Sequence, residues 1–190
     1  YQGQKITTKS DQGPSILALK KAVSAERVGE TVPIESPVRS SKSNGMMENA
    51  VKLWQEQLRT IKHDVETRFK RRIEVDSVLF SWLIPYVSDT LNKYKVGVDG
   101  VTAYERITGH KCRHFVLGFA ETVNYIFETD KGNQHKADSR VGSGVFLGYV
   151  WRTTEYFIGT SEGIFRFRTI KRKAQEIPYD ASCFDILKIT

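Results

Sequence analysis

The hydrophobic pattern of the chain changes its period near residue 110, and this change limits the possible folds more than any other feature. Before that point apolar side chains recur mainly every three or four residues, which is typical of helices. Beyond it, short β-type runs are separated by glycines. We therefore expect two parts, an α/β part over residues 1–110 and a β-rich part over residues 111–190.

The first part begins with a predicted strand, helix and strand. Residues 5–10 contain alternating β-branched side chains, and residues 31–35 form a second run in which Pro33 favours a sheet edge. Between these runs, Pro14 is suited to open a helix, and apolar residues follow it at helical spacing up to Val23.

A long helix is predicted next. Apolar residues from Met47 to Phe69 step by three and four and form a single stripe. The opposite face carries one acid followed by polar and basic side chains, namely Glu48, Lys52, Gln55, Arg59 and Lys62. A second helix is predicted over residues 77–95 and a helical turn over residues 101–109. The strands predicted after them include residues 122–127, 145–150, 155–160 and 164–170.

The composition is that of a globular protein with an excess of positive charge. The 190 residues include 29 Lys and Arg and 22 Asp and Glu, which gives a formal net charge of +7. This excess favours binding to nucleic acid, although a solvated surface with scattered charges gives the same balance. Two cysteines cannot build a disulfide framework. No apolar run approaches the ~20 residues of a membrane helix, so we expect no membrane partner.

Two carboxylates occupy positions that suit a metal site. Asp11 follows the first predicted strand, and Glu48 lies in the first turn of the long helix. Carboxylates at the ends of packed elements can converge on Mg²⁺, and paired ions about 3.5–4 Å apart promote phosphoryl transfer. Taken singly, Asp11 is typical of a turn or helix cap and Glu48 of a residue that complements the helix dipole. The combination is more specific than either residue.

The segments around both carboxylates resemble known motifs. Residues 10–14, Ser-Asp-Gln-Gly-Pro, are similar to the Ser/Thr-Asp-x-Gly/Glu-Pro segment around the second catalytic aspartate of retroviral and retrotransposon integrases. Residues 43–49, Ser-Asn-Gly-Met-Met-Glu-Asn, resemble the Asn-Gly-x-x-Glu-Arg segment around their catalytic glutamate. The interval from Asp11 to Glu48 is also close to the interval in those enzymes.

The likeness continues downstream in the same order. Residues 102–109, Thr-Ala-Tyr-Glu-Arg-Ile-Thr-Gly, resemble the Thr-Pro-x-Glu-x-x-x-Gly stretch of copia-type polyproteins. Residues 145–149, Val-Phe-Leu-Gly-Tyr, resemble their Gly-x-Phe-Leu-Gly-Tyr stretch. Asn49 stands where an arginine is usual and Ala103 where a proline is usual. Neither departure removes a metal ligand, and both fit a diverged element.

The resemblance implies an α/β RNase H-like core fragment whose first strands are missing, followed by a small all-β meander or barrel. It implies a triad of two aspartates and a glutamate that binds two Mg²⁺ or Mn²⁺ ions, with Asp11 as the second aspartate and Glu48 as the glutamate. The first aspartate is expected upstream of Tyr1. We therefore expect an enzyme that processes DNA 3′ ends and transfers strands, and expect this fragment to be inactive alone.

The implied partner is DNA rather than a small-molecule substrate, and the resemblance also implies oligomers and a nuclear location. Phosphate contacts are expected from the long helix and from the loop before it, at Arg39, Lys42, Lys52, Gln55, Arg59 and Lys62. An ordinary solvated helix face is the alternative for the helix residues. The cations between Arg166 and Lys173 form either a second DNA surface or a basic strand end.

Two other functional interpretations stay open on the sequence. One is a non-catalytic nucleic-acid-binding remnant of a transposable element, which keeps the fold and the basic surface without the chemistry. The other is a structural or protein-interaction α/β domain in which the motifs are coincidental. Metal-dependent strand transfer separates the integrase from both, and salt-dependent DNA binding separates the remnant from the interaction domain.

Overall fold

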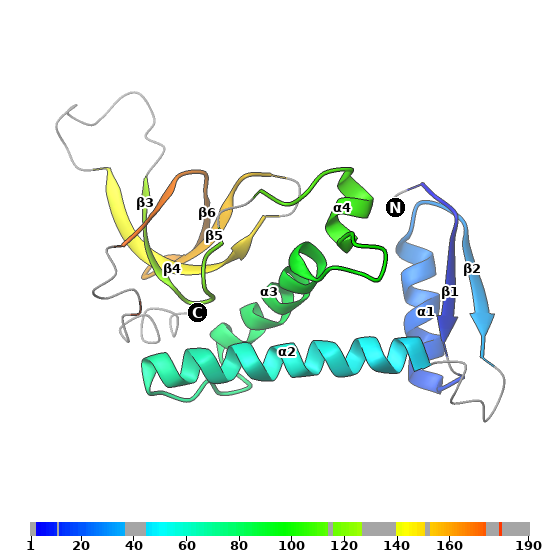
Figure 1. Ribbon diagram of the computed structural model, residues 1–190. Coiled ribbons are helices and arrows are strands. Elements are labelled where there is room, and N and C mark those ends of the chain that lie inside the picture. Colours follow the sequence, from blue (N-terminus) through cyan, green and yellow to red (C-terminus); the bar gives the residue numbers. More distant parts are fainter. Residues whose placement is uncertain are drawn as a thin grey trace. The chain divides into compact units, whose positions relative to one another are not determined.

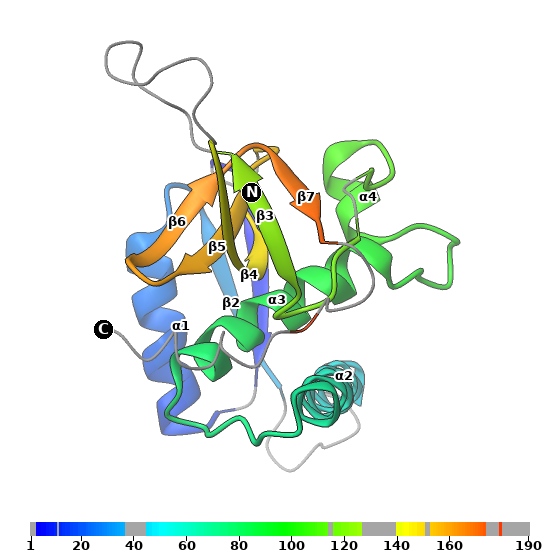
Figure 2. The same cartoon turned by 90° about the vertical axis from the view of Figure 1, so that its left-hand side faces the viewer.

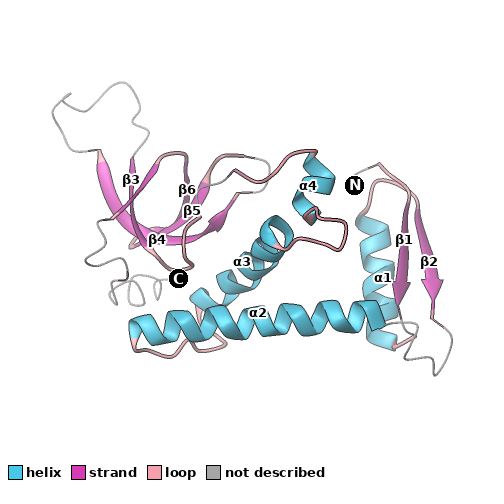
Figure 3. Cartoon of the chain, in the orientation of Figure 1, coloured by secondary structure: helices cyan, strands magenta, loops and turns pink. Residues whose placement is uncertain are grey.

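The computed structural model describes residues 3–10, 12–36, 45–113, 116–126, 140–150, 153–173 and 179. Helices and strands are both present within these residues, which confirms the mixed class that the sequence predicts (Figure 1, Figure 3). The elements are β1 (Ile6–Ser10), α1 (Pro14–Glu26), β2 (Thr31–Glu35), α2 (Gly45–Phe69), α3 (Val78–Tyr94), α4 (Ala103–Thr108), β3 (Thr122–Ile126), β4 (Val141–Tyr149), β5 (Tyr156–Thr160), β6 (Gly163–Phe167) and β7 (Ile170–Arg172).

The contacts divide the chain into two compact units, Tyr1–Leu53 and Trp54–Thr190. In the first unit β1 and β2 are parallel, with a register that runs from Ile6 opposite Thr31 to Ser10 opposite Glu35. Helix α1 makes the crossover that parallel strands need and lies alongside both of them (Figure 1). Both predicted strands and the predicted helix are confirmed.

The first unit has little core of its own. Among the described residues before Val65, no apolar side chain is buried. On α1, Leu19 is 63% exposed and Val23 is 42% exposed, and Ile34 of β2 is 46% exposed. The βαβ unit therefore leaves apolar surface uncovered.

The second unit contains a five-stranded antiparallel sheet with the order β6-β5-β4-β3-β7. Strands β3 to β6 follow one another as a meander, and β7 returns to the opposite edge beside β3 (Figure 2). The pairings of the described strands do not join β6 to β7. The sheet is therefore open, which corrects the predicted alternative of a barrel and leaves the meander.

The run predicted over residues 164–170 is divided between two strands at opposite edges of the sheet. Strand β6 ends at Phe167, whose ring stacks on Tyr125 of β3 with centroids 4.0 Å apart. The carbonyl oxygen of Thr169 then accepts a hydrogen bond of 3.1 Å from the N–H of Ile126. The chain crosses from one edge to the other within these residues because the sheet curves strongly enough to bring β6 near β3. Sequence periodicity does not report this curvature.

Both faces of the sheet are covered by apolar side chains. On one face, Val65 of α2 and Leu83 and Val87 of α3 pack with Val145 and Leu147 of β4. The other face holds a smaller cluster of aromatic and aliphatic residues, which contains Leu117, Val123, Tyr125, Phe146 and Ile158. Since α3 packs on β4, residues on both sides of position 110 share one core. The division predicted at residue 110 stays a prediction.

The two long helices follow the predicted periodicity. The stripe on α2 is exposed at its start, where Met47 is 60% exposed, and buried at its end, where Val65 is 1% exposed. Helix α3 begins after Ser77, whose hydroxyl oxygen accepts a hydrogen bond of 3.2 Å from the N–H of Phe80. Such a cap satisfies one of the amide groups that a helix start leaves unpaired.

Candidate functional site

The carboxyl ends of β1 and β2 lie level with each other. Ser10 at the end of β1 is in register with Glu35 at the end of β2. The N–H of the buried Ser36 donates a hydrogen bond of 2.9 Å to the carbonyl oxygen of Ser10. The side-chain amide of Gln12 donates to the carbonyl oxygen of Ser36 at 3.5 Å. The segments that leave the two strands are thus held together at one edge of the sheet.

The two predicted metal ligands differ in how they are placed. Asp11 lies outside the described residues, although its neighbours Ser10 and Gln12 both bond to Ser36. Glu48 lies in the first turn of α2, where the sequence predicts it, and it is exposed. The convergence of Asp11 and Glu48 stays a prediction.

The side chain of Glu48 suits a hard cation. Its exposed carboxylate supplies the oxygen ligands that Mg²⁺ and Mn²⁺ prefer. Within the described ranges, no three or more His, Cys, Asp or Glu side chains form a group that could hold a metal ion. Because Asp11 is not among those ranges, a Mg²⁺ or Mn²⁺ site at Asp11 and Glu48 stays a prediction.

The residues predicted to contact DNA lie on α2 and in the segment before it. Lys52, Gln55 and Arg59 are exposed on the helix and available to a ligand. Arg39 and Lys42 fall in the part of the chain that the structure does not describe. The predicted polar and basic face of α2 is therefore exposed at these three positions, while its contact with DNA stays a prediction.

Lys62, the last of the predicted DNA contacts, has a local partner. Its ammonium pairs with the carboxylate of Glu66 one turn further along α2. The same carboxylate accepts a hydrogen bond of 2.8 Å from the N–H of Ile73. Burial raises the pKa of Glu66, but the bonds from Lys62 and Ile73 outweigh it and hold that pKa below its ordinary value. Lys62 thus helps to fix the end of α2.

A half-buried ion pair that involves the sheet was not predicted from the sequence. The side chain of Glu121, just before β3, is only 4% exposed, and Arg172 of β7 donates to both of its carboxylate oxygens. Arg172 also donates at 3.0 Å to the carbonyl oxygen of Val116. Arg172 belongs to the cations considered as a second DNA surface, and these contacts give it a structural role. The partners are too distant in sequence for spacing to reveal the pair.

In the part of the chain that the structure describes, no helix combines the length and apolar character needed to cross a bilayer.

The comparisons with known proteins leave the family open. No protein-family model matches the chain, and no curated protein matches it either.

Proposed function

We propose that this chain is the C-terminal part of the catalytic core of a copia-type retrotransposon integrase, followed by a β-rich region. Such an enzyme trims DNA ends and joins a 3′-hydroxyl to target DNA by phosphoryl transfer. The proposal rests on the motifs around Asp11 and Glu48 and on the elements in which these motifs occur.

The observation that carries the proposal is the order of elements around the two motifs. Strand β1 ends at Ser10, immediately before Asp11, and α1 crosses over to the parallel strand β2. Glu48 follows β2 in the first turn of α2. Ligands of open α/β sheets bind beyond the carboxyl ends of the strands. Both motif residues thus follow strand ends at which a catalytic site is expected.

The RNase H-like assignment belongs to the same proposal. An isolated pair of strands is marginally stable at best, and parallel sheets are ordinarily covered on both faces. The exposed apolar side chains of Leu19 and Ile34 fit a unit that belongs to a larger sheet. An RNase H-like core is, by resemblance, such a sheet.

In the proposed site, Asp11 and Glu48 are two of three carboxylates, and the resemblance assigns the third to a strand upstream of Tyr1. Bound Mg²⁺ or Mn²⁺ supplies activation of the attacking oxygen and stabilisation of the leaving oxygen. Glu48 lies at the start of α2, where the helix dipole favours a negative charge. Lys52 and Arg59 provide positive charge for DNA phosphates. With only two carboxylates, the chain alone is expected to be inactive.

Strand transfer by a complete integrase that contains this chain tests the proposal. Glu48→Gln keeps the size of the side chain and removes its charge, so Mg²⁺-dependent strand transfer should fall by about 100-fold or more. DNA binding should stay within about two-fold, because the phosphate contacts are left in place. Glu56→Gln, at another exposed acid of α2, is the matched control and should keep activity. Full activity of the Glu48→Gln enzyme would refute the assignment.

A second candidate is a non-catalytic, nucleic-acid-binding remnant of a transposable element. The observation that favours it is the exposure of Lys52, Gln55 and Arg59, which need no metal to bind phosphates. DNA binding without any strand transfer by the complete protein would favour this candidate over the integrase.

A further inference from the structure

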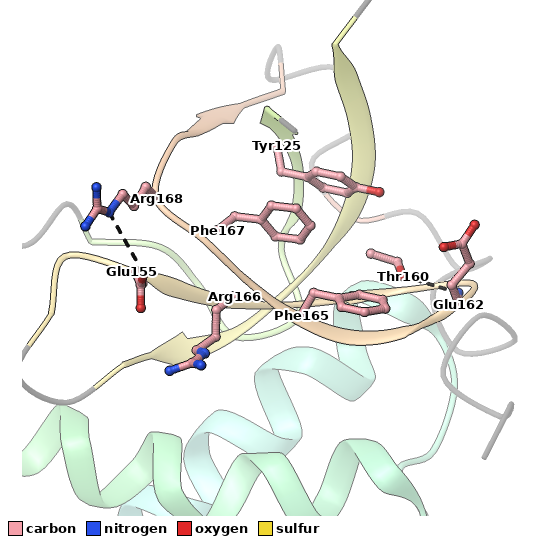
Figure 4. Close-up of a pocket in the computed structure, with 8 residues that line it drawn as sticks. All are labelled: Tyr125, Glu155, Thr160, Glu162, Phe165, Arg166, Phe167 and Arg168. Carbon is pink, nitrogen blue, oxygen red and sulfur yellow. Dashed lines mark hydrogen bonds and ion pairs between the residues drawn. The ribbon is translucent and has the colours of Figure 1, made fainter. Parts of the chain in front are cut away.

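A cavity of about 350 Å³ lies on the sheet of the second unit. Its walls come mainly from β6 and the turn before it, together with residues at the two ends of β5 and Tyr125 of β3. Figure 4 shows the rings of Tyr125, Phe165 and Phe167 gathered together, with Glu162 at one end and Arg168 at the other. No step of the proposed integrase chemistry uses this cavity.

The three aromatic rings differ in what they offer to a ligand. Phe167 stacks on Tyr125 with centroids 4.0 Å apart and planes 23° apart, so each ring covers a face of the other. Phe165 is paired across the strands with Ile158, which is fully buried, yet Phe165 itself is 45% exposed. Strand β6 is an edge strand, so Phe165 is open to solvent beside an already formed aromatic stack. A planar group can therefore stack on Phe165 without displacing the core.

The segment that carries Phe165 is strongly basic. Residues 163–173 contain five cations and no acid, and aromatic and basic residues alternate from Phe165 to Arg168. Arg166 and Arg168 are exposed, and Arg168 reaches Glu155 only at 3.9 Å, with 69% of its side chain exposed. Such a distant, exposed ion pair contributes little to stability, so Arg168 can readily exchange Glu155 for an anionic group of a ligand.

The combination favours a ligand that is both flat and anionic. Three aromatic residues with Glu155 and Glu162 nearby also suggest a cage for a methylated ammonium ion, which binds by cation–π contacts. Two observations oppose this alternative: Arg166 and Arg168 line the same cavity, and Tyr125 covers a face of Phe167. Nucleotides meet both requirements, because the base stacks on aromatic rings and the phosphate pairs with arginine.

We propose that the cavity along β6 binds unpaired nucleotides of single-stranded nucleic acid. Phe165 stacks with one base, and Arg168, at the end of the same cavity, contacts a neighbouring phosphate. A duplex keeps its bases inside the helical stack, so it can use Arg168 but not Phe165. The surface thus prefers single strands to duplex, and it needs no metal ion and no third carboxylate.

Fluorescence anisotropy with the 190-residue chain tests this proposal. The probes are a labelled oligodeoxythymidine of about 12 nucleotides, an abasic strand of the same length and a duplex, because single-strand sites span about 4–16 nucleotides. All measurements contain EDTA, so that a failure of the integrase proposal does not affect the result. Oligodeoxythymidine should bind roughly 5- to 100-fold more tightly than the abasic strand, the range expected for one stacked base.

Substitutions separate the base contact from the phosphate contacts. Phe165→Leu should reduce the affinity for oligodeoxythymidine to that for the abasic strand, whereas Phe165→Trp should keep the preference because it retains a stacking surface. Arg168→Gln should lower the affinity for oligodeoxythymidine and for the abasic strand by the same factor, and it should reduce the salt dependence of both affinities. Circular dichroism of each variant tests whether the fold is kept. Phe165→Trp is also a control for damage to the edge strand, because it changes the same residue and should still keep the preference for oligodeoxythymidine.

Three results would overturn the proposal. The first is equal affinity of the wild-type chain for oligodeoxythymidine and the abasic strand. The second is an unchanged preference in Phe165→Leu, which would place the base contact elsewhere. The third is full displacement of oligodeoxythymidine by poly-glutamate at equal charge concentration, which would indicate a surface for acidic peptides.

Discussion

Arg172 on the edge strand β7 binds the carboxylate of Glu121 through both Nε and Nη2, and the Nη2 to Oε2 distance is 3.0 Å. Glu121 also accepts a hydrogen bond of 3.0 Å from the N–H of Gly118. A charge that is 96% removed from solvent is thus matched by a cation from a segment about fifty residues away. This pair fastens β7 to the segment that leads into β3.

Loss of this pair should destabilise the second unit. Arg172→Met leaves the Glu121 carboxylate buried without its cation, and we expect a loss of about 2–3 kcal/mol in the free energy of unfolding. The value lies below that for fully buried pairs because the Arg172 side chain is 43% exposed. Lys171→Met, at the exposed neighbour, is the control and should change little. Urea denaturation measures both variants, and equal stability of the two would contradict the structural role of Arg172.

Close packing against Gly144 predicts a second loss of stability. A Cβ atom at this position on β4 would lie 2.5 Å from Cγ2 of Ile158 and 2.8 Å from the carbonyl oxygen of Gly159. Gly144→Ala should therefore force β4 and β5 apart and cost about 1–3 kcal/mol. Gly45→Ala, where nothing lies within 4 Å of the added atom, is the matched control and should be neutral or slightly stabilising. A Tm for Gly144→Ala equal to that of the parent chain would argue against this packing.

The elements were predictable where one periodicity persists over many residues. The stripe from Met47 to Phe69 requires a helix, and α2 covers these residues. The division between β6 and β7 was not predictable, because it follows from contacts such as that between Phe167 and Tyr125. Curvature of a sheet depends on residues distant in sequence, whereas periodicity reports only on neighbours.

The candidate site was predictable in part for the same reason. Glu48 at the start of α2 follows from a local pattern and is found there. The role of Arg172 was not predictable, because its partner Glu121 is remote in sequence. The sequence pattern around a basic residue on an edge strand is the same whether or not that residue forms an ion pair. The position of Asp11 relative to Glu48 stays a prediction of the motifs.

The ion pair at the end of α2 predicts a response to acid. The pKa of Glu66 is lower in the folded chain than its ordinary value of 4.5. The ionised carboxylate therefore contributes stability above the unfolded-state pKa, and this contribution is lost as the pH falls through the lower folded-state pKa. Glu66→Gln should cost about 1 kcal/mol at pH 7.

The difference between the two chains should shrink as the pH falls below 4.5, because the Glu66 carboxyl is protonated first in the unfolded chain and then, through its lower pKa, in the folded chain. Urea denaturation from pH 7 to pH 3 measures this convergence, and Glu56→Gln is the control at an exposed acid of the same helix. A constant difference across the whole range would show that Glu66 acts through packing and not through its charge.

The exposed cations of α2 predict a salt-dependent affinity for duplex DNA. If Lys52 and Arg59 each neutralise one phosphate, every substitution to glutamine should lower the slope of log affinity against log salt by about 1. Lys111→Gln removes another exposed charge, outside α2, and should leave the slope unchanged. The measurement is a titration of labelled duplex at several salt concentrations in EDTA. Equal slopes for all three variants would place the duplex-binding surface elsewhere, because a helix face that binds phosphates must release counterions when DNA binds.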